Sequence, residues 1–345
     1  MNGLAFEPSP GASARWLSRP PSPGGRGLLL GKLGTGGIVH IMSASKTSDP
    51  LALLTGELKN FEDIALYIKS SMEDVPTLAG IDVYGDTVPL NGVGGGDHII
   101  YVDFKKRYDL QARIEHAAAE GRPDIMEKLK LCRRMAGMVL LDVSGHHVTD
   151  AVLAAMLHQA FLLGSLYELD MFGQITKRLF ENLNTRFYNS SSSDKFVTMI
   201  YGEISEDATF RFLSAAHPPP VVFSNQIDRF MEVSQELCTS FPPIGTLPSD
   251  NVIDRRKTQS VLGFKDQYQL NEWKLMGTGD ILLLYTDGLL EHARGNEQYF
   301  PDHLEQKVRE LKHQRARQIF DGIKTDTLNF AEPSDDISIV VIKRT

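Results

Sequence analysis

Four apolar stretches that begin or end in aspartate set the strongest limit on how this chain folds. Asp97 opens DHIIYVDF, Asp142 closes MVLLD, Asp287 closes ILLLYTD, and Asp335 and Asp336 open DDISIVV. MVLL is apolar throughout, which predicts a strand buried on both faces. A carboxylate at the end of a buried strand is costly unless it is paired or bound to a metal. If these strand ends meet, four or five carboxylates converge without a matching Lys or Arg, and a hard divalent cation such as Mg²⁺, Mn²⁺ or Ca²⁺ relieves their repulsion.

A simpler explanation applies to any one of these aspartates taken alone. Asp beside Gly is common turn chemistry, in Asx turns, helix N-caps and strand ends. Asp150, for example, fits the first turn of the helix that follows it. The metal hypothesis therefore depends on the repetition of one pattern at four strand ends.

The order of the segments predicts an α+β fold. Strand patterns and helix patterns come in blocks instead of strict alternation, which favours antiparallel sheets layered with helices. Residues 1–49 are rich in Pro, Gly and Ser and predict a disordered tail. A leading amphipathic helix, with a linker or regulatory role, is expected within 50–76. The remaining 77–345 predicts one domain, with a polar helical insertion at about 105–134.

Composition excludes several classes of protein. The formal net charge of -8 argues against a nucleic-acid binder and, more weakly, against an anionic membrane as partner. The two cysteines form no CxxC motif. No apolar run is expected to reach the roughly 18–20 residues that span a bilayer. We therefore expect a cytoplasmic protein with no membrane and no nucleic-acid partner.

The motifs taken in order resemble a known family. They are GGGD (94–97), DVSGHH (142–147), FVT (196–198), AAHPPP (215–220), PPIG (242–245), GDILLLYTDGLLE (279–291) and DDIS (335–338). This set is similar to the metal-dependent type-2C protein serine/threonine phosphatases, and most closely to their bacterial SpoIIE/RsbU-like branch. The resemblance covers roughly residues 56–345.

The resemblance implies both a fold and a reaction. The fold is a four-layer αββα sandwich of two antiparallel sheets flanked by helices. The reaction is hydrolysis of phosphoserine or phosphothreonine on a regulatory phosphoprotein, such as an anti-anti-sigma factor, by a water that bridges two Mn²⁺ or Mg²⁺ ions. By position, the carboxylates of this site and the backbone carbonyl beside them would hold the metals. These residues are Asp97, Asp142, Asp287 and Asp335, then Gly145, and with less weight Asp336.

The chain departs from the family pattern at two places that bear on turnover. His147 stands where the family has a glycine, so it is strained if that position needs positive φ. A solvent-facing histidine in the first turn of a helix is the simpler interpretation. Ser214, Ala215, Ala216 and His217 replace the family's Asn-Ala-Gly-His.

Four further hypotheses follow. These departures motivate a phosphatase-like binding module with weak or no turnover, and a phosphodiesterase is a second alternative. In the insertion at 105–134, basic residues outnumber acidic ones, which suggests either a solvated excursion or a positive flap that docks a phosphoprotein. The amphipathic helix at 51–72 could pair with a second copy, giving a homodimer, or pack on its own domain.

Overall fold

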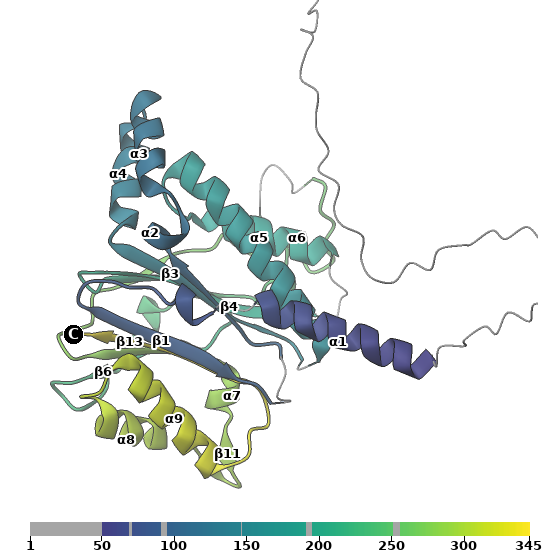
Figure 1. Cartoon of the computed structure of the whole chain (residues 1–345), viewed down its shortest axis with the longest axis vertical. Helices are drawn as coiled ribbons and strands as arrows, with labels where there is room; N and C mark the ends of the chain where they lie inside the picture. Colours follow the sequence, from purple (N-terminus) through teal and green to yellow (C-terminus); the bar gives the residue numbers. More distant parts are fainter. Residues whose placement is uncertain (1–49, 69–70, 91–94, 146, 191–194, 251–255) are drawn as a thin grey trace, which may run out of the picture. The chain divides into compact units, whose positions relative to one another are not determined.

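The computed structural model describes residues 50–345 except 69–70, 91–94, 146, 191–194 and 251–255. The predicted tail at 1–49 and His146 lie outside the described residues. Two sheets lie face to face between two groups of helices, as Figure 1 shows, so the predicted αββα sandwich is confirmed.

The first sheet has six strands. Its order is β2-β3-β4-β5-β8, with β9 also paired to β5. All pairings are antiparallel except the short parallel pairing of β5 with β8. The strands are β2 (His98–Asp103), β3 (Met135–Val143), β4 (Val197–Ser205), β5 (Phe210–Ala215), β8 (Ser240–Phe241) and β9 (Asn271–Trp273).

The second sheet has five strands in the order β1-β13-β10-β6-β7, all antiparallel. The last strand of the sequence therefore lies between the first strand and β10. The strands are β1 (Ile81–Val88), β13 (Ile337–Arg344), β10 (Ile281–Tyr285), β6 (Val221–Ser224) and β7 (Arg229–Phe230). A separate ribbon pairs β11 (Ala293–Arg294) with β12 (Glu297–Gln298).

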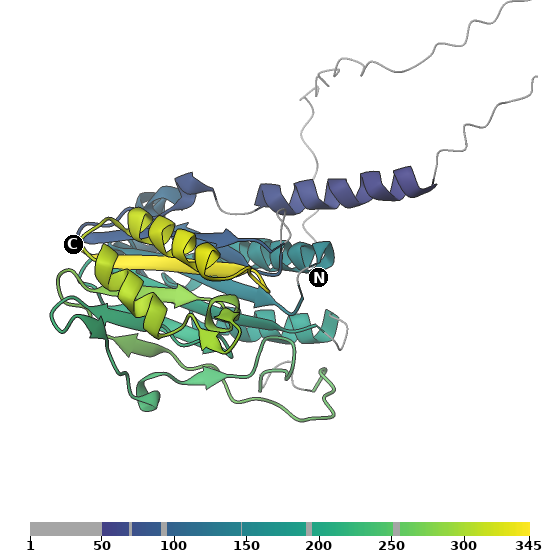
Figure 2. The ribbon, with the colours of Figure 1, turned by 90° about the horizontal axis from the view of Figure 1, so that it is seen from below.

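The described helices lie mainly on the outer faces of these sheets, and Figure 2 shows the layers from a second direction. On the six-stranded side are α2 (Phe104–Arg107), α3 (Leu110–Ala119), α4 (Pro123–Cys132), α5 (Val148–Phe172) and α6 (Lys177–Ser190). On the five-stranded side are α8 (Asp302–Leu311) and α9 (Ala316–Phe330). The short helices are η1 (Met72–Asp74), η2 (Gln235–Leu237) and α7 (Asp287–Leu290), and α1 (Pro50–Ile68) packs against α5.

This layering explains the continuous apolar strands. In β3, Val139 and Leu141 face the helices, whereas Leu140 faces the other sheet. In β13, Val341 packs with the cluster beneath α9 and Val340 packs between the sheets. Because both faces of these two strands are buried, the alternation of apolar with polar residues is lost along them.

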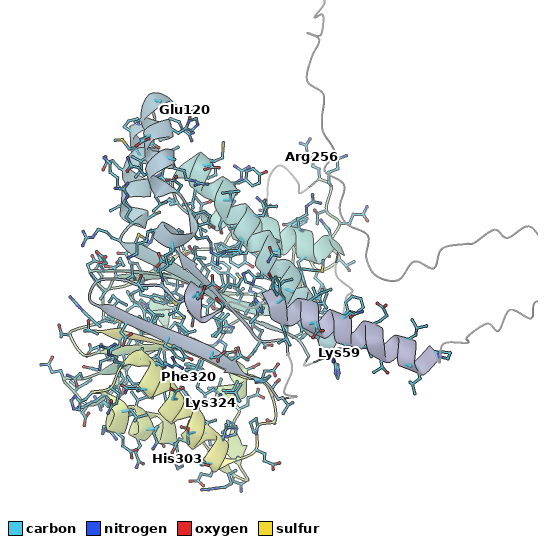
Figure 3. All side chains as sticks on the ribbon, in the orientation of Figure 1. Lys59, Glu120, Arg256, His303, Phe320 and Lys324 are labelled. Carbon is cyan, nitrogen blue, oxygen red and sulfur yellow. The ribbon has the colours of Figure 1, made fainter. Side chains whose placement is uncertain are left out.

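The excursion at 104–132 lies at one end of the six-stranded sheet. Asp103 pairs with Ala136 at that end, whereas His98 pairs with Leu141 at the other. A six-residue strand spans roughly 15–20 Å, so the excursion is separated by that length from Asp97. Figure 3 places Glu120 at the tip of the α3–α4 hairpin.

Several basic residues of this excursion hold the segment that leads into the sandwich. The Lys106 ammonium donates to the Val75 carbonyl oxygen at 3.1 Å, and Arg107 pairs with Asp74 at 2.9 Å. Lys105 donates to the Thr77 carbonyl. Docking of a phosphoprotein on a positive flap stays a prediction, but these three cations already have intramolecular partners.

Helix α5 contradicts the expectation that no apolar segment is long enough to span a membrane. Among the described helices it alone is long and apolar enough, by length and composition, to cross a membrane (Thr149–Phe172). The expectation that no segment reaches this length is therefore wrong. Core helices also meet this criterion, and Ala154, Leu157, Phe161 and Leu169 of α5 are buried in the cluster on the six-stranded sheet.

Candidate metal centre

Asp97 connects the two sheets at one end of the sandwich. It immediately precedes β2 and is 2% exposed. Its Oδ2 accepts a hydrogen bond of 2.7 Å from the Thr286 hydroxyl, which follows β10 in the other sheet. The same hydroxyl oxygen accepts the Ser338 amide N–H of β13 at 2.9 Å. Thr286 therefore holds the Asp97 carboxylate in place from the opposite sheet.

The backbone approaches closely beside Asp142. A Cβ on Gly96 would lie 2.3 Å from the Val143 carbonyl oxygen, 2.5 Å from that of Gly145 and 3.2 Å from Asp142 Oδ1. No side chain fits there, which is the physical reason for glycine at this position. Three oxygen atoms therefore face the Gly96 backbone.

The aspartates of the five-stranded sheet lie at two adjoining chain segments. Asp287 begins α7 directly after β10, and Asp335 and Asp336 precede β13. Asp336 is 3% exposed, and its Oδ1 accepts the Leu90 N–H at 2.8 Å. Its Oδ2 is buried without a hydrogen-bond partner. Asp335, which the family pattern favoured as the ligand, is the exposed member of the pair.

The pKa values show that these carboxyl groups are electrostatic neighbours. Burial, and then the charge of Asp142, raises the pKa of Asp97 well above its usual range. Burial raises the pKa of Asp142 to about 7, with further contributions from Asp287, Asp335 and Asp336. Burial and Asp335 also raise the pKa of Asp287. Among the described residues, no lysine or arginine is a cause of these three pKa shifts, so no described cation compensates the charge of the cluster.

The donor set fits a hard divalent cation. It consists of carboxylate and backbone carbonyl oxygens, it includes an unpartnered buried Asp336 oxygen, and its carboxylates repel each other. Within the described residues, no three side chains of His, Cys, Asp or Glu are gathered closely enough to hold a metal as they stand. The mutual effects on pKa nevertheless place the predicted carboxylates in one region, and their assignment as ligands stays a proposal.

His147 lies at the start of α5 with ordinary backbone geometry. Its φ is -100°, and its N–H donates to Asp150 Oδ2 at 3.0 Å. The side chain is exposed. His147 therefore does not have the positive φ that would have strained its backbone. It is an exposed histidine at the N-cap of α5, which agrees with the simpler interpretation.

The second departure from the family pattern does carry strain. Ala216, where the family has glycine, has a φ of +52°, in the left-handed region. The next residue, His217, is buried, with its Nδ1 3.0 Å from the Thr198 hydroxyl. Thr198 in turn pairs with Asp142 across β3 and β4. His217 therefore contacts the β4 residue that pairs with the candidate ligand Asp142 of β3.

Sequence reasoning missed two residues at this site. Thr286 stood in the YTD motif, yet its contact with Asp97 joins residues 189 positions apart. Lys195 gave no signal beyond its place before FVT, and its ammonium donates to the Ser144 carbonyl at 2.7 Å. Asp150, which was expected in a helix turn, is fully buried and pairs with Lys195 at 2.7 Å.

Comparison with known proteins agrees with this geometry. The family model described as Stage II sporulation protein E (SpoIIE) matches residues 133–345, more than half of the chain. The chain belongs to the SpoIIE family. The resemblance to SpoIIE/RsbU-like type-2C phosphatases is thereby confirmed.

A curated relative and several solved structures add to the comparison. Phosphoserine phosphatase RsbP of Bacillus subtilis (strain 168) is 24% identical over 200 residues, which cover 57% of this chain and 44% of RsbP. This chain therefore spans less than half the length of RsbP.

The solved structures are similar in fold. The SiaA-PP2C domain of Pseudomonas aeruginosa matches with a TM-score of 0.56 and 13% identity, covering 86% of this chain and 99% of that domain. The RsbU and RsbW domains of a Mycobacterium tuberculosis protein match with a TM-score of 0.53 and 17% identity, covering 80% of this chain and 64% of that chain. The PP2C phosphatase domain of Bacillus subtilis SpoIIE, with a fragment of its regulatory domain, matches with a TM-score of 0.52 and 16% identity. The match covers 76% of this chain and 63% of that chain.

Proposed function

We propose that this SpoIIE-family chain is a Mn²⁺- or Mg²⁺-dependent protein serine/threonine phosphatase acting on a regulatory phosphoprotein in the cytoplasm. The observation that carries the proposal is the mutual influence of aspartates from both sheets, with no cation of the described part of the chain to compensate them. The relative's name, phosphoserine phosphatase, supports the reaction class. An anti-anti-sigma factor is the substrate that we propose to test first.

The residues of the site have distinct tasks in this proposal. Asp97, Asp142, Asp287 and Asp335 or Asp336, with the Gly145 carbonyl, would hold two divalent ions. When bound, such ions activate water and neutralise charge on a phosphoryl group.

The protein's own residues hold the carboxylates in place and exclude water from the space behind them. Thr286 fixes the Asp97 carboxylate through a 2.7 Å hydrogen bond, and Gly96 leaves room for oxygens of the Asp142–Gly145 segment to approach. The apolar layer between the sheets, which includes Leu140 and Val340, excludes water from behind the carboxylates. In such a setting, fixed charges act more strongly than they would in bulk water.

One assay separates this function from its alternatives. We would measure hydrolysis of an aryl phosphate monoester and a phosphoserine peptide with and without Mn²⁺, using the full chain and Asp142→Asn. The exposed Asp321→Asn change is the matched control. We expect Mn²⁺-dependent monoester hydrolysis that Asp142→Asn abolishes and the control retains. Metal binding without turnover would favour the binding module, and preference for an aryl phosphodiester would favour a phosphodiesterase.

We also propose that α1 forms a homodimer with α1 of a second copy. Its large apolar residues recur at steps of three and four and remain exposed, namely Leu51 (69%), Leu54 (59%), Leu58 (46%) and Phe61 (48%). This spacing is that of a coiled-coil seam. Light scattering should show a dimer that a Leu58→Lys, Phe61→Lys variant converts to a monomer. A monomeric parent chain would contradict the proposal.

A further inference from the structure

Lys195 joins two segments beside the candidate metal centre. Its Nζ donates to the Ser144 carbonyl oxygen at 2.7 Å and forms an ion pair of 2.7 Å with Asp150 Oδ1. Asp150 is fully buried and also accepts the His147 N–H. The Lys195 side chain is 28% exposed, so most of it is enclosed by these contacts.

The Ser144–Gly145 turn depends on such external contacts. Gly145 has a φ of +116°, which side-chain-bearing residues rarely adopt, and no Cβ restricts its rotation. A Cβ at Gly145 would lie 2.5 Å from Asp150 Oδ2 and 2.9 Å from Lys195 Nζ. The Lys195–Asp150 pair therefore occupies the space on one side of this glycine.

The Gly145 carbonyl of the same turn lies near a candidate ligand. The Gly145 carbonyl oxygen approaches the Gly96 backbone together with Asp142 Oδ1. The turn is also bound to β4, because Ser144 N–H donates to the Phe196 carbonyl at 3.0 Å. Phe196 N–H returns a hydrogen bond to the Ser144 hydroxyl at 3.2 Å. Lys195, the neighbour of Phe196, thus adds the contact that fixes the Ser144 carbonyl itself.

We propose that Lys195 is a positioning residue: it holds the Ser144 carbonyl and, with Asp150, packs against Gly145, so that the Gly145 carbonyl of the next peptide unit faces the metal site. This inference rests on the proposed function, because it assumes that the site binds a divalent cation. Lys195 acts here through backbone geometry and does not itself ligate the metal or touch the reacting phosphate.

The direction in which Mn²⁺ affinity changes when Lys195 is removed distinguishes a positioning role from an effect of its charge. A lysine ammonium near a cation site opposes metal binding by Coulomb repulsion. If Lys195 acted only through its charge, its removal would tighten Mn²⁺ binding. If it positions the carbonyl, its removal weakens Mn²⁺ binding despite the loss of repulsion.

Calorimetric titration of the metal-free full chain with MnCl₂ tests this difference. We expect Lys195→Met to weaken Mn²⁺ affinity by about tenfold or more, the range found when partners that orient metal ligands are removed. Lys195→Arg, which keeps a donor, should retain most of the affinity. The exposed Lys274→Met change is the matched control and should leave affinity unchanged.

A double variant separates positioning from general destabilisation. Lys195→Met leaves Asp150 buried without its cation, so the added Asp150→Asn change should restore thermal stability but not Mn²⁺ affinity. Unchanged or tighter Mn²⁺ binding by Lys195→Met, or affinity restored in the double variant, would overturn the inference. Failure of the unmodified chain to bind Mn²⁺ would overturn the proposed function and this inference together.

Discussion

Replacing Asp142 by asparagine should stabilise the metal-free protein while destroying its affinity for Mn²⁺. Asp142 lies at the end of β3, and its pKa is raised by burial and by the charges of Asp287, Asp335 and Asp336. An ionised carboxylate in this position therefore opposes folding when no metal is present. Asparagine keeps the shape of the side chain and removes the charge.

The magnitude follows from the shift of this pKa. The value rises from 3.8 to about 7, and each pKa unit corresponds to about 1.4 kcal/mol. Above pH 7 the group is ionised in both the folded and unfolded states, so the whole cost, roughly 4 kcal/mol, opposes folding. As the pH falls from 7 towards 3.8, the folded state takes up its proton first and the cost declines, to about 1.5 kcal/mol at pH 5.

Urea unfolding in the presence of EDTA measures this effect. We expect the free energy of unfolding of Asp142→Asn to exceed that of the parent chain by a few kcal/mol at pH 8, and by less at pH 5. Asp321→Asn, the same chemical change at an exposed site, should stay within about 0.5 kcal/mol of the parent. Added Mn²⁺ should stabilise the parent and not Asp142→Asn. A variant that is no more stable than the parent at pH 8 would refute this reasoning.

Two further changes test other parts of the site, and a third tests His158, a buried residue of α5 whose Nδ1 lies 2.8 Å from His98 Nε2. Ala216→Gly should relieve left-handed strain of about 1–2 kcal/mol, partly offset by the greater unfolded-state entropy of glycine, giving a small gain in urea stability; a loss of stability would contradict it. Thr286→Val should reduce the free energy of unfolding by about 1–3 kcal/mol, because Asp97 and the Ser338 N–H lose a buried partner; Thr286→Ser should lose less, and equal losses would argue against the hydroxyl. Burial lowers the pKa of His158 to about 4, so this residue reduces stability as the pH falls from 6.5 towards 4, by about 1.4 kcal/mol at pH 5.5. His158→Gln should therefore lose less stability than the parent between pH 7.5 and 5.5, and equal losses would contradict the assignment.

The fold could be predicted where local pattern and burial agree. MVLL and ISIVV are apolar on both faces because helices cover one side of each strand and the other sheet covers the opposite side. Helices α3 and α4 are separated around Gly121, Arg122 and Pro123, where glycine and proline interrupt the helical pattern. The short strands β7, β8 and β9 were not predicted, since two or three residues carry no periodicity.

The candidate site was predictable only in part. The aspartates were visible because charge interrupts apolar strands at their ends. The groups that position them were not, because Thr286 meets Asp97 across 189 residues and Lys195 meets Ser144 across 51. The sequence also gave no means of telling that Asp336 would be buried and Asp335 exposed, since that depends on how β13 enters the sheet.

The place of β13 sets an order of events during synthesis. This strand is the last in the sequence, yet it joins β1 to β10 and brings Asp335 and Asp336 to the site. While residues 335–344 are still being made, β1 and β10 have no common neighbour and the remaining aspartates lack two of their companions. The five aspartates can therefore come together only after β13 has been synthesised.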